Sequence, residues 1–316
     1  MTMTCRVCAN GVGNKTHIAR EMMFGWRDEF AYMECAACGC LQNVAVPEDL
    51  ARYYGASYYS VGENAPAYRP VYDRLKKLRT GAYLSRKGLI GGALLRKFGS
   101  PDLPAWVTRA GVRQDSRILE VGCGSGARLL SLRSEGFSQL AGADPSLEAD
   151  IDYGRGLRIS KAHVSEIKDR YEFIVLEDAF EHIPDPHATL AALSSLLEPN
   201  GVLIISIPLA GYAWQRYGVN WVQLDAPRHL YLHTEKSFRI LANAMTVMDV
   251  QYDSGPVQFW GSEQYEKGIP LLDECSYRVN PDNGIFSAQH IAEFANKAQE
   301  LNAQRLGDQA TFYLRN

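Results

Sequence analysis

The sequence predicts an α/β protein whose main part is a doubly wound, mostly parallel sheet, preceded by a small cysteine-rich module. Three observations support this fold class. From about residue 105, short apolar segments alternate with helical segments, and several are apolar on both faces, as buried parallel strands are. A glycine-rich turn follows the first of these segments. The first forty residues hold most of the cysteines.

The whole chain has the composition of an ordinary globular protein. Its 316 residues are 46% apolar and 22% charged, with a net charge of −3 that favours no class of partner. The length suits one large domain with appendages. No N-terminal run resembles a signal peptide, and no apolar segment approaches the roughly 20 residues needed to span a bilayer. We therefore expect a cytoplasmic protein.

Residues 1–46 read as a zinc-binding module. The segments "CRVC" (5–8) and "CAACGC" (35–40) each contain a Cys-x-x-Cys pair. Two such pairs offer one zinc ion four thiolates, from Cys5, Cys8, Cys35 and Cys38. Cys40 is then a spare, His17 could replace one ligand, and free thiols at chance spacing are the alternative. Four thiolates leave no open coordination position, so we expect a structural ion.

Residues 47–104 read as a connector or lid that is helical and basic. Within residues 69–97, one acid, Asp73, stands against nine basic side chains. These are Arg69, Arg74, Lys76, Lys77, Arg79, Arg86, Lys87, Arg96 and Lys97. Such a stretch could be a solvated helix face, a peripheral contact with the inner membrane face or a lipid-linked substrate, or a track for a phosphate backbone.

Residues 105–316 form the α/β domain, and its strands follow in order. The five candidates of the first part are "RILEVG" (117–122), "QLAGAD" (139–144), "LRIS" (157–160), "EFIVLED" (172–178) and "GVLIISIP" (201–208). Two later runs, "TVMDVQYDS" (246–254) and "QATFYLRN" (309–316), would supply the last strands. Between them lies a substrate-side insertion at about 255–308, with a helix over 287–306.

The first strand runs into "EVGCGSG", where Gly122, Gly124 and Gly126 allow a tight turn against a ligand at a helix N-terminus. With Ala127 the turn also fits the G-x-G-x-x-A dinucleotide pattern. Asp144, at the end of the second strand, would hydrogen-bond the ribose of either NAD or S-adenosylmethionine. A purely structural turn is the remaining alternative.

Four segments together carry a family resemblance: "ILEVGCGSG", "GADPS", "LEDAFEHIPDP" and "LEPNGVLIISIP". In order and spacing they resemble the motifs of class I S-adenosylmethionine-dependent methyltransferases, over residues 110–255. The resemblance implies a Rossmann-like, seven-stranded sheet whose last strand is antiparallel, with the cofactor across the ends of the first strands.

The same resemblance implies a set of cofactor-binding residues. Glu120, Gly122, Cys123 and Gly124 would line the methionine moiety, Asp144 would hold the ribose, and His163 and Val164 would flank the adenine. Gly126, Pro145 and Glu177 belong to the same expected site. Tyr58 and Tyr59 either close over the cofactor or pack in the core.

The outer segments suggest a subfamily. The cysteine pairs, "LARYYGASYYS", "LDAPRHLYLHTEKSF" (224–238) and "DSGPVQFWGSEQY" (253–265) resemble zinc-containing methyltransferases of bacterial surface-polysaccharide and deoxysugar pathways. The chain lacks the large C-terminal addition of the sugar C-methyltransferases in that group, which favours O-methylation of a sugar or glycan, nucleotide- or lipid-linked. The alternatives are a zinc-containing RNA methyltransferase, although nucleic acid is the less favoured partner, and a non-catalytic S-adenosylmethionine-binding protein.

The segment "LEDAFEHIPDP" follows a predicted strand, so its polar side chains are expected at the ligand-binding edge of the sheet. They are Glu177, Asp178, Glu181 and His182. A sugar hydroxyl needs a base, and His182 is the first choice. His182 could instead be a structural partner of the neighbouring loop or a metal ligand. The acids offer Mg²⁺ oxygen ligands, without a defined set.

The segment "APRHLYLHT" holds two further histidines. His229 is expected to return to the ligand crevice and help position the acceptor, whereas His233 is expected on the surface before a helix capped by Thr234. Arg228 could bind an anionic sugar or diphosphate, or form a structural salt bridge.

Overall fold

A computed structural model describes residues 3–54, 69–282 and 284–316. Tyr58 and Tyr59 therefore lie outside the described residues. The chain divides into two compact units, which exchange segments several times along the sequence. Unit 1 consists of Met1–Gly55, Phe180–His187 and Ser206–Phe312; unit 2 consists of Ala56–Ala179, Ala188–Ile205 and Tyr313–Asn316.

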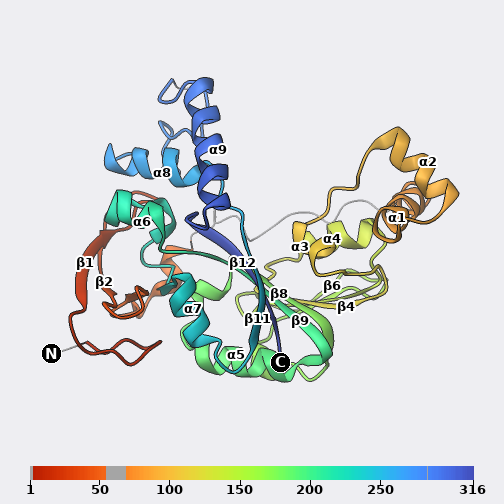
Figure 1. The fold of residues 1–316 in the computed structure, drawn as a ribbon, viewed down its shortest axis with the longest axis horizontal. Helices are drawn as coiled ribbons and strands as arrows, with labels where there is room; N and C mark the ends of the chain where they lie inside the picture. The colour runs from red at the N-terminus through yellow and green to blue at the C-terminus, as the bar shows by residue number, and fades with distance from the viewer. Residues whose placement is uncertain (1–2, 55–68, 283) are drawn as a thin grey trace. The chain divides into compact units, whose positions relative to one another are not determined.

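Unit 1 contains a small antiparallel sheet built on the cysteine-rich segment. Its strands are β1 (Lys15–Arg20), β2 (Glu29–Glu34), β3 (Leu41–Asn43) and β10 (Tyr231–Leu232), in that spatial order. β1 and β2 form the hairpin drawn in red in Figure 1. The fourth strand comes from a part of the chain far beyond residue 46, and Tyr231 pairs with Gln42. The cysteine-rich segment is thus part of a larger unit, because a strand from the second half of the chain completes its sheet.

The helices of unit 1 range from single 3₁₀ turns to the 16-residue α9. They are η1 (Leu50–Tyr53), η3 (Phe180–His182), α6 (Tyr212–Tyr217), η4 (Gly218–Asn220), η5 (Val222–Leu224), α7 (Glu235–Leu241), α8 (Val257–Glu266) and α9 (Ala288–Ala303). Trp214, Trp221 and Phe259 are buried in one apolar cluster with residues of β1–β3. The predicted helix over 287–306 is confirmed as α9, and the predicted Thr234 cap of α7 is confirmed by a 3.0 Å bond from the Ser237 N–H to its hydroxyl.

The large sheet confirms the predicted α/β fold. Its strands are β4 (Arg117–Val121), β5 (Gln139–Ala143), β6 (Ile151–Asp152), β7 (Arg158–Ser160), β8 (Tyr171–Glu177), β9 (Leu197–Pro208), β11 (Thr246–Tyr252) and β12 (Gln309–Arg315). They follow the spatial order β11-β12-β9-β8-β4-β5-β7-β6, and β9 and β12 run from one unit into the other. All seven predicted strands are present. The eighth, β6, is a two-residue strand antiparallel to β7 that carries too little pattern to be read from sequence.

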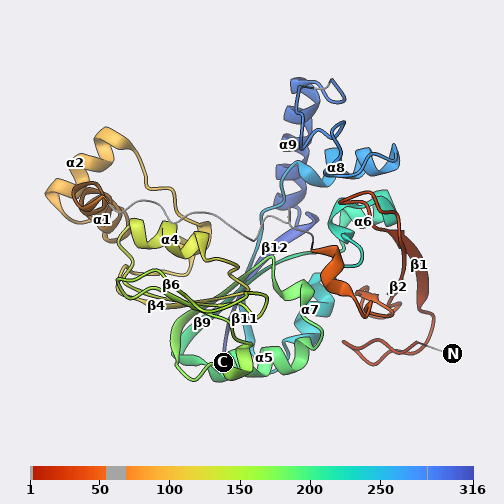
Figure 2. The same ribbon diagram turned by 180° about the vertical axis from the view of Figure 1, so that it is seen from behind.

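The parallel pairings of β4 with β5 and β8, and of β5 with β7, form the centre of unit 2. Its helices are α1 (Pro70–Ser85), α2 (Leu89–Phe98), α3 (Ala105–Arg109), α4 (Ala127–Ser134), η2 (Val164–Glu166) and α5 (Pro186–Ser195), the last beginning in unit 1. Ile118, Leu129 and Ile159 belong to its buried core. α1 and α2 lie side by side as a helical hairpin (Figure 2). No described helix is long and apolar enough to cross a membrane.

Candidate functional site

The glycine turn between β4 and α4 has a backbone conformation that would be strained for any residue other than glycine. Gly122, Gly124 and Gly126 have φ angles of 73°, 53° and 82°. A Cβ on Gly122 would lie 2.5 Å from the Cβ of Ala179, and one on Gly126 would lie 2.8 Å from Cδ1 of Ile159. The predicted tight turn is confirmed, and it leaves backbone atoms at the N-terminus of α4 able to approach a ligand closely.

Asp144 follows β5 and reaches back to this turn. Its Oδ2 accepts a 2.7 Å hydrogen bond from the Gly124 N–H. Its Oδ1 accepts bonds of 2.8 Å from the Ser146 N–H and 2.6 Å from the Ser146 hydroxyl. Each carboxylate oxygen has two lone pairs, so Oδ1 is fully used and Oδ2 keeps one lone pair for a ribose hydroxyl.

Glu120 gives a further reason to expect a ligand here. The carboxylate is buried, and its Oε1 accepts a short hydrogen bond from Arg128. Burial, despite the opposing charge of Arg128, raises the pKa of Glu120 to about 7. Its Oε2 is buried and has no hydrogen-bond partner among the described residues. A buried acceptor of this kind fits a donor on a bound molecule, such as the α-ammonium group of S-adenosylmethionine.

The other predicted cofactor residues lie in the loops after β4, β5, β7 and β8. Cys123 is half-buried in the glycine turn, and Pro145 is exposed after β5. His163 caps the 3₁₀ turn η2, and Val164 is the first residue of that turn. Glu177 ends β8 and contacts Arg128 Nε at 3.2 Å and Trp106 Nε1 at 3.3 Å. Their contacts with the cofactor stay predictions.

A second polar group lies in unit 1, on η3 and on the loop that precedes β10. Nδ1 of His182 lies 2.9 Å from the carbonyl oxygen of Arg228 and 3.1 Å from the Tyr54 hydroxyl. A carbonyl oxygen only accepts, so this nitrogen carries the proton. The lone pair of the neutral ring is then on Nε2, which is the tautomer required of a base acting through that atom.

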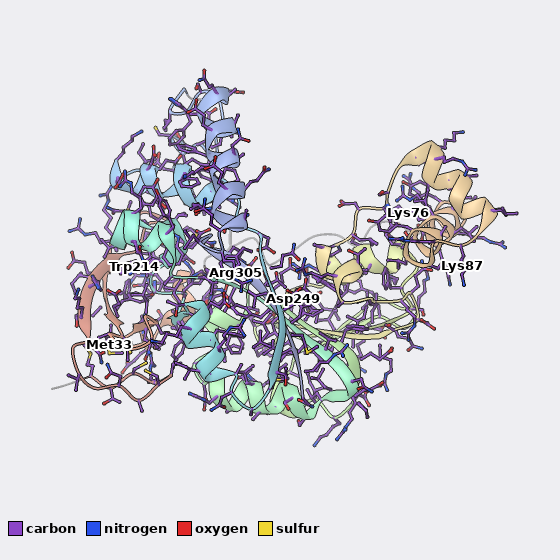
Figure 3. All side chains as sticks on the ribbon, in the orientation of Figure 1. Met33, Lys76, Lys87, Trp214, Asp249 and Arg305 are labelled. Atoms are coloured by element: carbon purple, nitrogen blue, oxygen red, sulfur yellow. The ribbon has the colours of Figure 1, made fainter. Side chains whose placement is uncertain are left out.

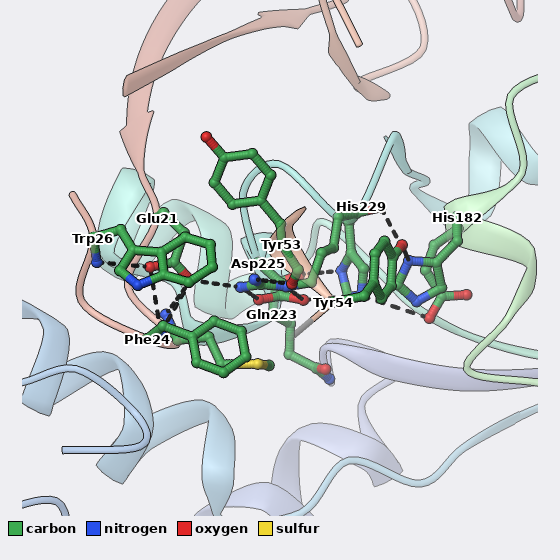
Figure 4. A network of polar contacts seen from close by, with 12 residues as sticks. Glu21, Phe24, Trp26, Tyr53, Tyr54, His182, Gln223, Asp225 and His229 are labelled. Carbon is green, nitrogen blue, oxygen red and sulfur yellow. Dashed lines mark hydrogen bonds and ion pairs between the residues drawn. The ribbon is translucent and has the colours of Figure 1, made fainter. Parts of the chain in front are cut away.

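His229 lies beside His182, with ring centroids 4.7 Å apart (Figure 4). Its Nδ1 donates to the carbonyl oxygen of Gln223 at 2.8 Å. Its Nε2 is 3.8 Å from Glu181 Oε1 and 3.9 Å from Asp225 Oδ2. Burial lowers the pKa of His229, against the opposing effect of Asp225, which favours a neutral ring at pH 7.

Among the described residues, the acidic side chains of "LEDAFEHIPDP" do not gather into one group of possible metal ligands. Within the described ranges, two groups of at least three side chains could hold a metal ion: the four cysteines, and Glu181 with His182 and His229, whose ligand atoms lie within 4.8 Å of one another. The expectation of Mg²⁺ held by the clustered acids thus finds no support.

Arg228 forms a structural salt bridge, which is the second of the two roles predicted for it. Its side chain is fully buried and donates to both carboxylate oxygens of Asp225, at 2.9 and 2.6 Å. It also donates to Glu21 Oε1 at 3.0 Å and to the carbonyl oxygen of Tyr53 at 2.9 Å. The carboxylate of Glu21 in turn accepts bonds of 3.0 Å from the N–H groups of Met23, Phe24 and Trp26 (Figure 4). Four donors of the guanidinium are therefore already engaged.

Sequence reasoning missed Glu21, Tyr54, Gln223 and Asp225, and it misplaced His233. His233 precedes α7 as expected, but it is 1% exposed, packed among Phe180, Tyr231 and Phe238. Burial lowers the pKa of His233 to about 3. The expectation of a surface histidine is therefore wrong, because β10 and α7 bury the residue between them.

The four cysteines predicted to bind zinc are brought together. The sulfur atoms of Cys5 and Cys38 are 3.7 Å apart, and those of Cys8 and Cys35 are 3.5 Å apart. Tetrahedral zinc with Zn–S bonds of about 2.3 Å requires sulfur separations of about 3.8 Å. The Gln42 amide donates to the Cys5 sulfur at 2.8 Å, a hydrogen bond that orients a ligating thiolate. The residues present fit the ion.

The two further candidates for this cluster lie outside it. His17 bonds Glu34 at 2.8 Å, and Cys40 lies against His233 instead, with its sulfur 3.8 Å from Nδ1. The cluster is thus formed by the two Cys-x-x-Cys pairs themselves.

Comparisons with known proteins bear on the α/β domain. Residues 95–245 match a family described as "Methyltransferase domain". The ubiquinone biosynthesis O-methyltransferase of Aeromonas salmonicida is 29% identical over 32% of this chain and 47% of its own length, so the match spans about half of that relative. The same enzyme of Pectobacterium carotovorum is 27% identical over 55% of this chain and 76% of its own.

Solved structures are similar at lower identity. The cyclopropane synthase MmaA2 of Mycobacterium tuberculosis is 19% identical with a TM-score of 0.39, covering 64% of this chain and 78% of its own. A putative sarcosine dimethylglycine methyltransferase of Galdieria sulphuraria is 16% identical with a TM-score of 0.42, covering 85% and 98%. The sheet order, the glycine turn with Asp144 and the family match lead to one conclusion: the chain has the Rossmann-like fold of class I, S-adenosylmethionine-dependent methyltransferases, and its residues 95–245 match a methyltransferase domain.

Proposed function

We propose that this protein O-methylates a hydroxyl group of a sugar or glycan, with His182 as the base. The observation that carries the proposal is the 2.9 Å bond from Nδ1 of His182 to the carbonyl oxygen of Arg228, which places the lone pair on Nε2. S-adenosylmethionine, when bound at the glycine turn and Asp144, supplies an electrophilic methyl group. What the chain itself must then provide is a place for the acceptor and a destination for its proton.

The surroundings of His182 suit proton uptake. An imidazole that gains a proton becomes a cation, and the negative charge of Asp225 interacts with His182 across the site. Arg228 fixes Asp225 through two hydrogen bonds, so the carboxylate is held in place before the reaction. His229, neutral and 4.7 Å away between ring centroids, offers a polar contact to the acceptor.

The acceptor is proposed to be a sugar because the group is strongly polar and contains a fixed base. A sugar hydroxyl is far less acidic than a phenol and gains more from a base. The second candidate is a phenolic acceptor, favoured by the names of the relatives, which are ubiquinone biosynthesis O-methyltransferases. The finer assignment to surface-polysaccharide synthesis rests on the resemblance of the cysteine-rich and outer segments to that group.

A structural zinc ion is part of the same proposal. The sulfur pairs Cys5–Cys38 and Cys8–Cys35 are 3.7 and 3.5 Å apart, and all four sulfur atoms lie within 4.8 Å of one another, which supports a tetrahedral site. Tyr32, on the neighbouring strand β2, donates a 2.7 Å bond to the carbonyl oxygen of His229. Zinc would therefore act on the acceptor side only through the fold of unit 1.

The test is a methyl-transfer assay with S-adenosylmethionine and a panel of nucleotide sugars, glycans, catechols and RNA, with products identified by mass spectrometry. The matched pair of variants is His182→Asn, which keeps a donor for the Arg228 carbonyl but removes the base, and His187→Asn, an exposed histidine of the same segment. We expect His182→Asn to lower turnover by about 10²–10⁴-fold with cofactor affinity unchanged, and His187→Asn to be neutral.

Several outcomes would contradict the proposal. Methylation of catechols but of no sugar would establish the second candidate, and methylation of RNA alone would establish the RNA methyltransferase reading. Full turnover in His182→Asn together with loss of activity on chelation, restored by a divalent cation, would make the Glu181–His182–His229 group a metal site instead. Tight cofactor binding without transfer to any acceptor would indicate a binding protein.

A further inference from the structure

The hairpin of α1 and α2 exposes large apolar side chains on unit 2. Leu89 is 94% exposed, Val71 76%, Ile90 65% and Phe98 58%. Val71 is followed at helical spacing by Leu75 and Leu78, both also exposed, so α1 carries an apolar stripe. Scattered exposed apolar residues are ordinary, but a stripe along one helix beside an apolar helix start is an interaction surface.

The same hairpin carries a large positive charge. Of its nine basic side chains, Lys76 and Arg79 pair with the buried Glu135, at 3.2 and 3.5 Å. The other seven form no ion pair within the described part of the chain; they are Arg69, Arg74, Lys77, Arg86, Lys87, Arg96 and Lys97. The single acid, Asp73, lies 4.0 Å from Arg155. Lys87, labelled in Figure 3, lies in the turn between the two helices.

Contacts within the chain itself hold α1 and α2 in place. Gly91 lets the helices meet closely, since a Cβ there would lie 2.2 Å from the carbonyl oxygen of Leu78 and 2.6 Å from Cβ of Ala82. Thr80 donates a 2.5 Å bond to Glu135, and the carbonyl oxygen of Lys77 accepts a 3.0 Å bond from the Gln114 amide. The hairpin is therefore attached to unit 2 through Thr80, Lys76 and Arg79 at Glu135, and through Leu84, which packs against the core. Val71, Leu89, Ile90 and Phe98 stay exposed.

The combination of exposed apolar and basic side chains on the hairpin indicates which kind of partner it would bind. A phosphate backbone would use the cations but has nothing to bury Val71, Leu75, Leu89 or Ile90. A second copy of the chain would bring seven cations against seven. An anionic lipid bilayer takes up both kinds of side chain, because aliphatic groups enter the acyl boundary while Lys and Arg reach the head groups.

We propose that residues 69–98 bind the surface of an anionic phospholipid membrane, with the α1–α2 hairpin lying in the plane of the interface. Leu89 and Ile90, at the start of α2, supply the apolar insertion, and Arg86 and Lys87, directly before them, supply head-group contacts. This inference does not depend on the acceptor proposed above, because it rests on a surface that contains none of the site residues.

The test is co-sedimentation of the full chain with vesicles of phosphatidylcholine alone and of phosphatidylcholine mixed with phosphatidylglycerol. We expect binding only to the anionic vesicles, weakened in about 1 M salt, where the screening length falls to about 3 Å. Arg86→Gln with Lys87→Gln should lower the partition coefficient about 30-fold. Leu89→Ser with Ile90→Ser should lower it at least about tenfold, since each buried aliphatic side chain contributes strongly.

Matched controls separate the surface from general charge and apolarity. Lys168→Gln with Arg170→Gln removes two exposed cations elsewhere on unit 2, and Val12→Ser removes a valine that is 80% exposed. Both should bind like the parent. Because Leu89 and Ile90 are so exposed, their replacement should leave the melting temperature and S-adenosylmethionine affinity unchanged. Equal binding to neutral vesicles, no binding to anionic vesicles, or tighter binding to single-stranded RNA that ignores Leu89→Ser with Ile90→Ser would each overturn the proposal.

Discussion

Replacing Arg228 with methionine tests whether its ion-pair network holds unit 1 together. The change keeps an apolar stem of similar length but removes the guanidinium, which donates four hydrogen bonds to Asp225, Glu21 and the Tyr53 carbonyl. Two buried carboxylates then lose their cation. Removing one partner of a buried pair costs about 3–5 kcal/mol, so we expect the free energy of unfolding to fall by about 4 kcal/mol near pH 7.

The loss of stability in Arg228→Met should depend on pH, and the ionisation of Asp225 decides whether it grows or shrinks as the pH falls. Burial opposes the charged form of this carboxyl, but the charge and hydrogen bonds of Arg228 prevail and lower its pKa. The stability that Asp225 contributes is therefore present above its unfolded pKa of about 3.9 and is lost as pH falls through the folded value. In Arg228→Met the carboxyl is buried without its cation and takes up a proton more readily. The difference between variant and parent should thus shrink between about pH 7 and about pH 4.5.

Urea unfolding followed by tryptophan fluorescence measures both effects. Four of the five tryptophans report on unit 1: Trp26, Trp214, Trp221 and Trp260. The control is Arg239→Met, which breaks an exposed pair with Glu235 and should cost under about 1 kcal/mol. Adding Asp225→Asn to Arg228→Met should recover part of the stability, since asparagine tolerates the φ of 38° at this position. If Arg228→Met lowers the free energy of unfolding no more than Arg239→Met does, or lowers it equally at both pH values, the Arg228 network does not stabilise unit 1 in this way.

Three further predictions follow from the metal, cofactor and histidine sites. Protein purified without added metal should contain one zinc ion per chain by elemental analysis, retained in Cys275→Ser and lost when Cys35 and Cys38 are both replaced by serine. Asp144→Ala should weaken S-adenosylmethionine binding by about 1–3 kcal/mol in calorimetry, and preference for NAD would refute the cofactor assignment. Burial lowers the pKa of His233 to about 3, so its neutral form stabilises the fold above pH 6.5 and that contribution declines below it; about 1.4 kcal/mol should be lost between pH 7.5 and 5.5. His233→Gln should remove that part of the slope, and an unchanged slope would show that His233 is not its source.

The sheet could be read from the sequence because its signals are local. Each strand from β4 to β9 that was predicted is a short apolar run with a turn on either side, and the glycine turn with Asp144 has a fixed spacing. The cysteine cluster was equally readable, since two Cys-x-x-Cys pairs specify a ligand set without any knowledge of the fold. β6 was missed because two residues carry no periodicity.

The surroundings of the histidines could not be read, because they depend on contacts between distant segments. Glu21 reaches Arg228 across 207 positions, and nothing near Glu21 marks it as a buried carboxylate. Asp225 had a local signal, three residues before Arg228, but that spacing alone does not distinguish a buried pair from an exposed one. His233 was misplaced because its burial comes from the aromatic rings of three separate elements, Phe180 of η3, Tyr231 of β10 and Phe238 of α7.

The origin of β10 sets a limit on how this protein can be altered or have evolved. Its two residues complete the cysteine-rich sheet, yet they begin only two positions after His229 in the chain. Removing or exchanging residues 1–46 alone would take away Glu21 and Tyr32, the partners of the Arg228 side chain and of the His229 carbonyl. The front segment and the loop over 221–234 can therefore only be transplanted between relatives as a matched set, although residues 47–220 separate them in the sequence.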